Sequence, residues 1–413
     1  MLIEGNKGGE FRLVDVDERR LNLAEALIRK LIEDRNLPWT VVATTNRKEA
    51  LSGSNYLINS IEVAGLECVR PDNDIPLEFG ISQNIGDTIG PGGLFKAMRT
   101  VPTYLDILND AEELCPEALV LNYTNPMSIM CLAAGRVSSM RTVGLCHSVQ
   151  GTSRMLADYC DVPIEDVRWQ CAGINHLAWF TEFSGPNGDL YPLLFEQALD
   201  RESKFSKAEP VRSDMMLNFG AFITESSGHL SEYLPYYRKR PDLLERYTDT
   251  GYRGEGSFYA NNWPRWRSEQ DATRERMISG EQPIEWKRSL EYGASIIEAI
   301  EKNAPCVIHG NVMNDGHILN LAQDGSVEVA CLVDRNGIQP THFGALPKHM
   351  AAICDSNMRM FDLAADACIF QDREMAVQAL LLDPLSAAVC CPAEIREMTN
   401  RMFAAEAEFL PGF

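Results

Sequence analysis

The chain has 413 residues, of which 45% are hydrophobic and 23% are charged, as is typical of globular proteins. Its length accommodates two or three domains. The 59 acidic and 38 basic residues give a net charge of −21, which disfavours a nucleic acid partner because phosphate binding requires a positive surface. No apolar run approaches the roughly 20 residues that cross a bilayer, so we expect no membrane partner.

The cysteines indicate a reducing compartment. The twelve cysteines are scattered without a short repeating spacing, and most lie inside apolar segments. This distribution favours reduced thiols over a disulfide framework. The first residues also lack the apolar stretch of a secretory signal, so we expect a cytoplasmic location.

The first half of the chain alternates between strand-like and helix-like patterns. Asp17 follows the first apolar run and is expected to cap a helix that carries Leu21, Leu27 and Leu31 on one face. A long helix is expected over 94–114. The predicted strands are 11–17, 39–45, 56–61, 118–123 and 142–146. Strands alternating with helices predict an α/β fold with a parallel, doubly wound sheet of Rossmann type.

The second half has a mixed pattern. Residues 309–314 and 327–333 are expected to form strands, and 287–303 an amphipathic helix. Residues 251–281 are polar and are expected to be irregular or a surface helix. The last seventy or so residues are predicted to be mostly helical. This mixture predicts an α+β arrangement for the second half.

Several polar side chains fall where the predicted parallel strands end. They are Asp15, Glu62, Asn125 and Cys146. Ligands of doubly wound sheets bind outside the carboxyl ends of the strands, so this edge is the candidate site. A strand that ends in an aspartate often indicates ribose recognition, although helix capping explains Asp15 equally well. The glycine-rich segment 81–93, which carries Asp87, is expected to form a loop over this edge.

Cys146 and His176 form a candidate metal site. They lie 30 residues apart, and we expect them to meet if two neighbouring strands end at the same edge. A thiolate and an imidazole suit a borderline divalent cation, and two protein ligands would leave open positions for catalysis. A buried cysteine and a core histidine are the alternative. The dense polar stretch 224–233 is a further site candidate, or else a polar loop that caps a helix.

The ordered motifs together resemble glycoside hydrolase family 4, and within it the melibiase-type α-galactosidases. The motifs are LVDVDERRL, NIGDTIGPGG, NYTNPM, GLCHSVQG, CAGINHLAWF, TESSGHLSEY, GNVMNDG and VEVACLVDRNGIQP. The resemblance implies a lactate-dehydrogenase-like dinucleotide-binding domain, placed at 1–172, and a C-terminal α+β domain for substrate and metal, placed at 173–413. It also implies NAD⁺, a divalent metal, usually Mn²⁺, a small-molecule glycoside as substrate, and a homodimer or homotetramer.

The resemblance implies a role for each matching residue. Cys146 and His176 match metal ligands, and Asn125 and His147 match substrate contacts. Asp15, Glu62 and Asn125 are the expected cofactor contacts. The implied route removes a hydride from C3 of the sugar, takes the C2 proton with Tyr233 as base, and expels the glycosidic oxygen with Asp87 as acid. Water then adds and the hydride returns.

The start of the chain departs from the family pattern. The family opens with a strand, a Gly-x-Gly-Ser turn and a helix that binds the pyrophosphate. Here Gly5, Gly8 and Gly9 precede the predicted strand 11–17 with no strand ahead of them. The sequence therefore predicts an N-terminally truncated dinucleotide domain, so that either the natural protein begins upstream or this chain binds NAD⁺ weakly.

Three other functions stay open on the sequence alone. One is a family 4 glycosidase for uronic or phosphorylated sugars, for which Arg238, Lys239 and Arg240 are candidate phosphate contacts. Another is a hydroxy-acid dehydrogenase of the same fold, although simple hydride transfer does not need a Cys–His metal pair. The last is an inactive homologue that binds sugar without turning it over.

Overall fold

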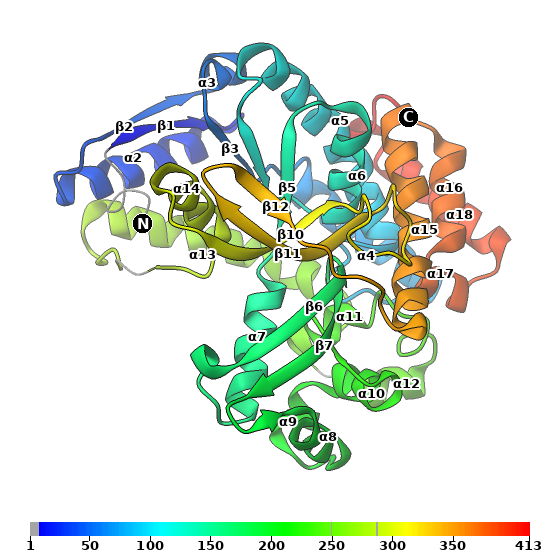
Figure 1. Cartoon of the computed structure of the whole chain (residues 1–413). Coiled ribbons are helices and arrows are strands. Elements are labelled where there is room, and N and C mark those ends of the chain that lie inside the picture. Colours follow the sequence, from blue (N-terminus) through cyan, green and yellow to red (C-terminus); the bar gives the residue numbers. More distant parts are fainter. Residues whose placement is uncertain (1–7, 249, 286–287) are drawn as a thin grey trace.

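The computed structural model describes residues 8–248, 250–285 and 288–413 (Figure 1). Among these residues, ten strands form one mixed sheet and two form a separate sheet. The strands are β1 (Gly9–Val14), β2 (Trp39–Thr44), β3 (Tyr56–Asn59), β4 (Leu119–Asn122), β5 (Arg141–Leu145), β6 (Arg168–Ile174), β7 (Leu177–Gly185), β8 (Gly188–Asp189), β9 (Phe222–Ile223), β10 (Cys306–Met313), β11 (Ser326–Asp334) and β12 (Gly337–Pro340).

Helices connect and cover these strands. In the first half they are α2 (Glu18–Asp34), α3 (Arg47–Leu51), α4 (Gly65–Glu78), α5 (Gly90–Leu114), α6 (Met127–Val137), α7 (Ser148–Tyr159), α8 (Tyr191–Leu199), α9 (Lys204–Ala208) and α10 (Pro210–Phe219). In the second half they are α11 (Ser227–Leu230), α12 (Pro241–Tyr247), α13 (Phe258–Ser279), α14 (Tyr292–Lys302), α15 (Lys348–Phe370), α16 (Arg373–Leu382), α17 (Pro384–Val389) and α18 (Pro392–Ala405).

The predicted Rossmann-like α/β fold is confirmed. Strands β3, β4 and β5 are parallel neighbours, and β1 pairs in parallel with β2. The C-terminal strands extend the same sheet, because β10 pairs antiparallel with β5 and β11 continues to β6. The sheet order is β3-β4-β5-β10-β11-β6-β7-β8, and β9 and β12 pair with β7 and β11. Strands β1 and β2 stand outside this sheet.

Local sequence signals explain where the helices begin. Asp17 caps α2 as predicted, accepting hydrogen bonds from the backbone N–H groups of Arg19 and Arg20. Helix α5 begins at Gly90, four residues before the predicted start, because Pro91 suits the first helical turn. Residues 251–281 contain the surface helix α13. Of the predicted helix 287–303, residue 287 lies outside the described residues.

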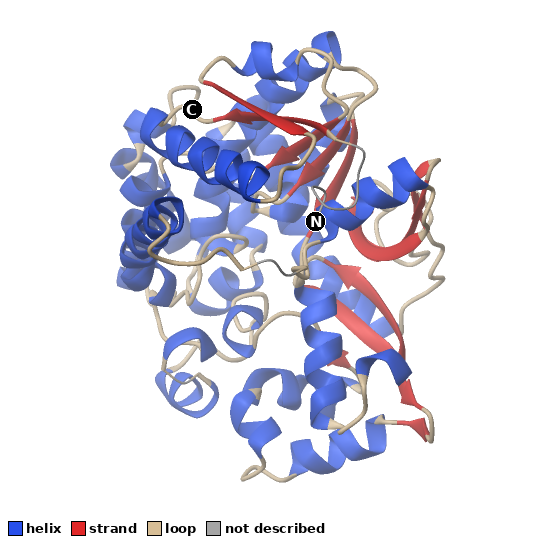
Figure 2. Cartoon of the chain, turned by 90° about the vertical axis from the view of Figure 1, so that its left-hand side faces the viewer, coloured by secondary structure: helices blue, strands red, loops and turns tan. Residues whose placement is uncertain are grey.

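Two groups of elements frame the sheet in Figures 1 and 2. Strands β6 and β7 extend below the rest of the sheet, with α7 beside them and α8 and α9 at their far end. Helices α15, α16 and α18 stand together on the other side of the molecule. Large buried side chains such as Tyr104, Trp179 and Phe361 belong to one continuous core. Packing against this core supports the strand ends that carry the candidate site.

The strands that precede Cys146 and His176 are not neighbours, contrary to expectation. Strands β10 and β11 lie between β5 and β6. One lateral row of the sheet runs from Gly144 through Asn311 and Glu328 to Gly173. The two predicted ligands therefore meet through the segments beyond the strand ends, and the intervening strands place Asn311 and Glu328 between them.

Candidate active site

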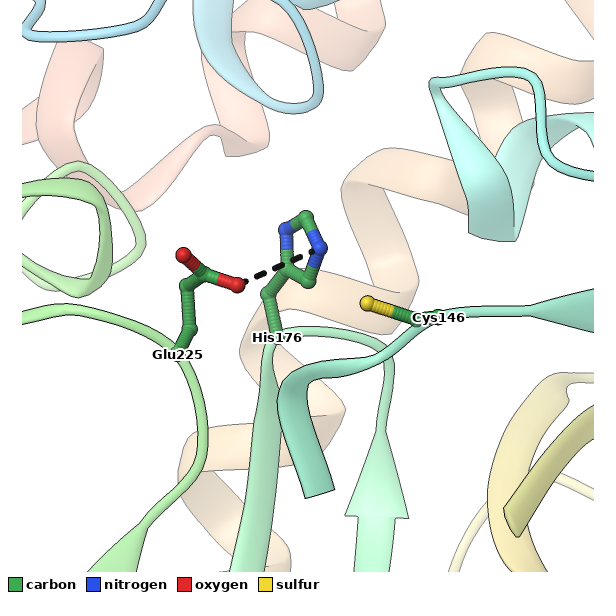
Figure 3. A group of neighbouring side chains, drawn as sticks. All are labelled: Cys146, His176 and Glu225. Carbon is green, nitrogen blue, oxygen red and sulfur yellow. Dashed lines mark ion pairs between the residues drawn. The ribbon is translucent and has the colours of Figure 1, made fainter. Parts of the chain in front are cut away.

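Three side chains converge into a cluster that can hold a metal ion. The cluster comprises Cys146 after β5, His176 in the β6–β7 turn and Glu225 after β9, with one ligand atom of each lying within 4.8 Å of the others. Figure 3 shows the thiol and the carboxylate on opposite sides of the imidazole, with His176 Nε2 3.5 Å from Glu225 Oε2. The structure therefore brings the predicted Cys–His pair together and adds a carboxylate.

The backbone at this cluster adopts a conformation that non-glycine residues rarely use. His176 has φ of 62° and Glu225 has φ of 72°. Left-handed conformations at such residues cost about 1–3 kcal/mol and gather at functional sites. Sequence reasoning missed Glu225 as a ligand, although it lies in the polar stretch singled out as a site candidate. Its carboxylate position depends on this turn, which the sequence pattern does not reveal.

The donor set fits a divalent cation of borderline softness. Burial raises the pKa of the Cys146 thiol to about 11, and the nearby Glu225 carboxylate adds to this effect. Burial acts to raise the pKa of Glu225 too, but the His176 and His229 imidazoles and a hydrogen bond from Tyr252 lower it to about 2. The site thus has one fixed negative charge, and a bound cation would displace the thiol proton.

Asp87 belongs to a buried group of charged side chains that also includes Lys96 and Glu62. The sequence indicated the two carboxylates but not the lysine. Lys96 Nζ lies 3.3 Å from Asp87 Oδ2 and 3.0 Å from Glu62 Oε2. Asn125 Nδ2 lies 3.5 Å from the same Asp87 oxygen. Burial acts to raise the pKa of Asp87, but the Lys96 ammonium and the His229 imidazole hold it below the usual range. In this structure Asp87 is therefore ionised and accepts hydrogen bonds. Lys96 escaped sequence reasoning because nothing in the predicted helix 94–114 set this lysine apart from the other polar residues of the helix.

Tyr233 lies beside the metal cluster, as its predicted role requires. Its hydroxyl is 3.2 Å from His176 Nδ1, and its side chain is fully buried. Burial and then the charges of Asp87 and Glu225 raise the pKa of the phenol well above its ordinary value. The same imidazole nitrogen lies 3.1 Å from His229 Nε2, and His229 Nδ1 contacts Glu232. Tyr233 thus faces the Cys146–His176–Glu225 cluster in a buried, polar environment.

Other buried polar groups surround the cluster without hydrogen-bond partners. Both carboxylate oxygens of Glu328, both amide atoms of Asn175 and Oδ1 of Asn311 are buried and unsatisfied. Burial and then the neighbouring Cys146 raise the pKa of Glu328 well above its ordinary value. Buried polar atoms normally have partners, so these groups indicate a place for a polar ligand or for water. Sequence reasoning missed Glu328 and Asn311 because they lie within apolar strands.

Glu62, one of the candidate cofactor contacts, lines a charged cavity of about 510 Å³, within the usual size range of small-molecule sites. The cavity lies at the first turns of α2 and α4 and is covered by α13. Among its lining residues are Asp17, Arg19, Arg20, Glu62, Gly65 and Arg267. Glu62 also contacts Lys96, so one ammonium group links the cavity to Asp87.

The residues around this cavity fit a dinucleotide in part. Asp15 follows β1 and accepts a hydrogen bond from the Asp17 N–H at 2.9 Å, which leaves its second oxygen for a ribose hydroxyl. Arg19 and Arg20 supply positive charge, although both also pair with Asp271. A glycine-rich turn between a strand and a helix is absent from the cavity-lining residues that the structure describes.

The structure places two other predicted groups apart from the cluster. The His147 side chain is 69% exposed, and its partner is Glu291 at 3.6 Å. Arg238 is buried and donates to backbone or hydroxyl oxygens of Ser82 and Gly254. Arg240 pairs with Asp242 on the surface. These arginines therefore offer poor phosphate contacts, contrary to the suggestion from sequence.

No helix among the described residues is long and apolar enough to cross a membrane. All twelve cysteines are free.

Comparisons with known proteins identify the family. Residues 2–162 match the family 4 glycosyl hydrolase domain, and residues 171–386 match the family 4 glycosyl hydrolase C-terminal domain. The α-galactosidase of Bacillus subtilis (strain 168) is 36% identical over 419 aligned residues, covering 100% of this chain and 95% of that protein. An α-galacturonidase of the same organism is 32% identical, covering 93% and 88%.

Solved structures share the fold. The LplD protein of Bacillus subtilis has a TM-score of 0.86 and 28% identity, covering 97% of this chain and 94% of that one. A 6-phospho-β-glucosidase of Thermotoga maritima, solved with manganese, NAD⁺ and glucose-6-phosphate, has a TM-score of 0.80 and 20% identity over 99% and 95%. The two family matches and the identity to the α-galactosidase over the whole chain show that the chain belongs to glycosyl hydrolase family 4 and is a glycoside hydrolase.

Proposed function

We propose that this protein hydrolyses α-galactosides with NAD⁺ and a divalent metal, Mn²⁺ or a similar ion, as cofactors. The convergence of Cys146, His176 and Glu225 beside Tyr233 and Asp87 carries the proposal. The 36% identity to an α-galactosidase over the whole chain supports the choice of substrate.

The proposed division of work follows from the contacts. Cys146, His176 and Glu225 would hold the metal, and Asp15, Glu62 and Asn125 would contact the dinucleotide. When bound, NAD⁺ supplies a hydride acceptor for C3 and the metal supplies a Lewis acid beside O2 and O3. These roles assign the first half of the chain to cofactor binding and residues 173–413 to substrate and metal contacts, and that division stays a prediction.

Tyr233 and Asp87 are the proposed proton-transfer groups. Tyr233 is the proposed base for the C2 proton, because its buried hydroxyl lies 3.2 Å from Nδ1 of the metal ligand His176. Burial raises the pKa of this phenol well above its ordinary value, so Tyr233 must first lose its own proton. Asp87 is ionised here, so it must first gain a proton to act as the acid that was predicted. Burial acts to lower the pKa of Lys96, but the Asp87 and Glu62 carboxylates raise it above its ordinary value, so the Lys96 ammonium keeps Asp87 ionised and the proton must come from another group. His147 stays a predicted substrate contact.

The charges around the cluster favour a neutral sugar. After burial, the charges of the Asp87, Glu225 and Glu232 carboxylates act on Tyr233, so all three lie near its side chain. An anionic sugar would meet these carboxylates, and Arg238 is already occupied. The 32% identity to an α-galacturonidase nevertheless makes uronic acid substrates the alternative to test.

A panel of nitrophenyl glycosides tests the function, with NAD⁺ and Mn²⁺ each omitted in turn. We expect release of nitrophenol from the α-galactoside only when both cofactors are present. Preference for the galacturonide would replace the substrate assignment. NADH that accumulates in proportion to substrate consumed would instead indicate a dehydrogenase, and sugar binding without turnover would indicate an inactive homologue.

Substitution of the ligands tests the metal site directly. Cys146→Ser, His176→Ala and Glu225→Gln should each weaken Mn²⁺ binding, measured by calorimetry, because each removes a donor from the cluster. Cys391→Ser, at an exposed cysteine, is the matched control and should bind Mn²⁺ normally. Full activity of the wild-type protein in excess chelator would contradict the proposal.

We further propose that the protein works in the cytoplasm as a homodimer or homotetramer. Twelve free cysteines support a reducing compartment. Light scattering of the purified protein measures the assembly, and a monomer at working concentration would contradict it.

A further inference from the structure

Glu232 connects two parts of the candidate site that are far apart in the sequence. Its Oε1 accepts hydrogen bonds from three successive backbone N–H groups, those of Asn84 at 2.7 Å, Ile85 at 3.2 Å and Gly86 at 3.1 Å. The next residue of that loop is Asp87. Its Oε2 contacts His229 Nδ1. One buried carboxylate thus anchors the Asp87 loop and touches a histidine of the metal side.

A metal-bound histidine is neutral, and in that state the contacts decide which nitrogen of each imidazole carries a proton. A carboxylate oxygen accepts, so His229 Nδ1 is the donor to Glu232 in this arrangement. In the neutral imidazole, His229 Nε2 is then an acceptor. Since it lies 3.1 Å from His176 Nδ1, that nitrogen must be the donor. The unprotonated Nε2 of His176 therefore faces Cys146 and Glu225, as a metal ligand must.

The same arrangement orients the phenol. Tyr233 OH lies 3.2 Å from His176 Nδ1, which has no free lone pair when it carries a proton. The phenol therefore cannot donate to this nitrogen, and its own proton points elsewhere. The outer partners of metal-binding histidines commonly fix ring orientation and tautomer in this way.

We propose that Glu232 is a positioning residue that sets the metal-binding tautomer of His176 through His229 while it holds the Asp87 loop in place. The proposal rests on the proposed metal role of His176. It assigns no bond-making step to Glu232, because the side chain acts only through its neighbours.

Glu232→Gln separates tautomer control from simple packing. The amide oxygen can still accept from the loop, whereas its N–H group would donate to His229 Nδ1 and reverse both tautomers. His229→Asn keeps a donor toward Glu232 but is too short to reach His176. We expect either variant to weaken Mn²⁺ binding by about 10–100-fold. Glu406→Gln, which alters an equally buried carboxyl group away from the cluster, is the matched control and should bind Mn²⁺ normally.

A spectroscopic measurement reads the tautomer without reference to activity. Nitrogen-15 NMR of histidine-labelled, metal-free protein should show His176 protonated on Nδ1 in the wild type and on Nε2 in Glu232→Gln. Suppose that the wild type binds Mn²⁺ and His176→Ala does not. If Glu232→Gln and His229→Asn then both bind Mn²⁺ as tightly as the wild type, the positioning role is wrong while the proposed function stands. If wild type and His176→Ala bind Mn²⁺ equally, the metal assignment itself fails. Should Glu232→Gln not fold, His229→Asn alone decides the outcome.

Discussion

The chemistry of this site depends on a few side chains whose neighbours change their ordinary behaviour. Asp87 is buried yet ionised because Lys96 lies beside it, whereas the Cys146 thiol is buried and protonated. The Asp87 carboxyl group is thus ionised and the Cys146 thiol is protonated within one site. The surroundings of each group set its proton state. Such divergence is a common property of active sites.

Tyr233 provides the first prediction at the scale of single residues. If it takes the C2 proton, product formed in D₂O should carry deuterium at C2, and Tyr233→Phe should slow turnover and suppress this exchange. Mass spectrometry of the released sugar measures both. Tyr237→Phe removes another buried hydroxyl, one that donates to Asp214 at 2.9 Å, and should leave the exchange unchanged. Undiminished exchange in Tyr233→Phe would move the base role to His229 or Glu232.

At the scale of elements, a buried ion cluster joins α4 and α5 to the end of α18. Arg99 contacts both oxygens of Asp72, at 3.1 and 2.7 Å, and also contacts Glu406. Burial, and then the Asp72 charge, raise the pKa of Glu406 to about 9. With two carboxyl groups around one guanidinium, the cluster is expected to hold one proton at neutral pH.

This cluster predicts how stability changes with pH. The folded-state pKa of Glu406 lies above the unfolded value of about 4.3, so between these values the folded protein binds more protons than the unfolded one. The free energy of unfolding should therefore fall as pH rises, by about 2–3 kcal/mol between pH 7 and 9. Glu406→Gln mimics the protonated group and should flatten this dependence, measured by urea unfolding. Glu374→Gln, at an exposed ion pair with Arg396, should not.

Element positions were predictable from sequence because they depend on local patterns. The apolar runs at 39–45 and 142–146 correspond to β2 and β5 within one residue at either end, and Asp17 caps α2 as its position suggested. The fold class followed from the alternation of these patterns. Helix α12 was not predicted, because its seven residues are too few to show a clear periodicity.

Site residues were predictable only where a motif named them. Cys146 and His176 were found from motifs, and the structure brings them together. Glu225 and Lys96 were missed because their roles depend on a left-handed turn and on contacts between segments distant in sequence. Their positions result from the order of strands in the sheet, and a single sequence does not determine that order.

At the scale of the whole molecule, one sheet joins the two halves of the chain. Strands β10 and β11 connect β5 to β6, so the loops of the first half and the β6–β7 turn share one rigid support. Glu62 lines the cavity and contacts Lys96, which also contacts Asp87, so one buried ammonium group links the cavity to the candidate catalytic carboxylate.

Strands β1 and β2 lie outside the ten-stranded sheet, so we expect them to unfold locally without the rest of the molecule. These two strands pair only with each other, helices α2 and α3 pack beside them, and Val14 and Val42 remain 44% and 40% exposed. Hydrogen–deuterium exchange should therefore show the amides of β1 and β2 opening at a lower free energy than those of the buried strands β4 and β5. Equal protection in both regions would mean a single unfolding unit. With unequal protection, this parallel strand pair can open and close while the sheet that supports the metal cluster stays folded.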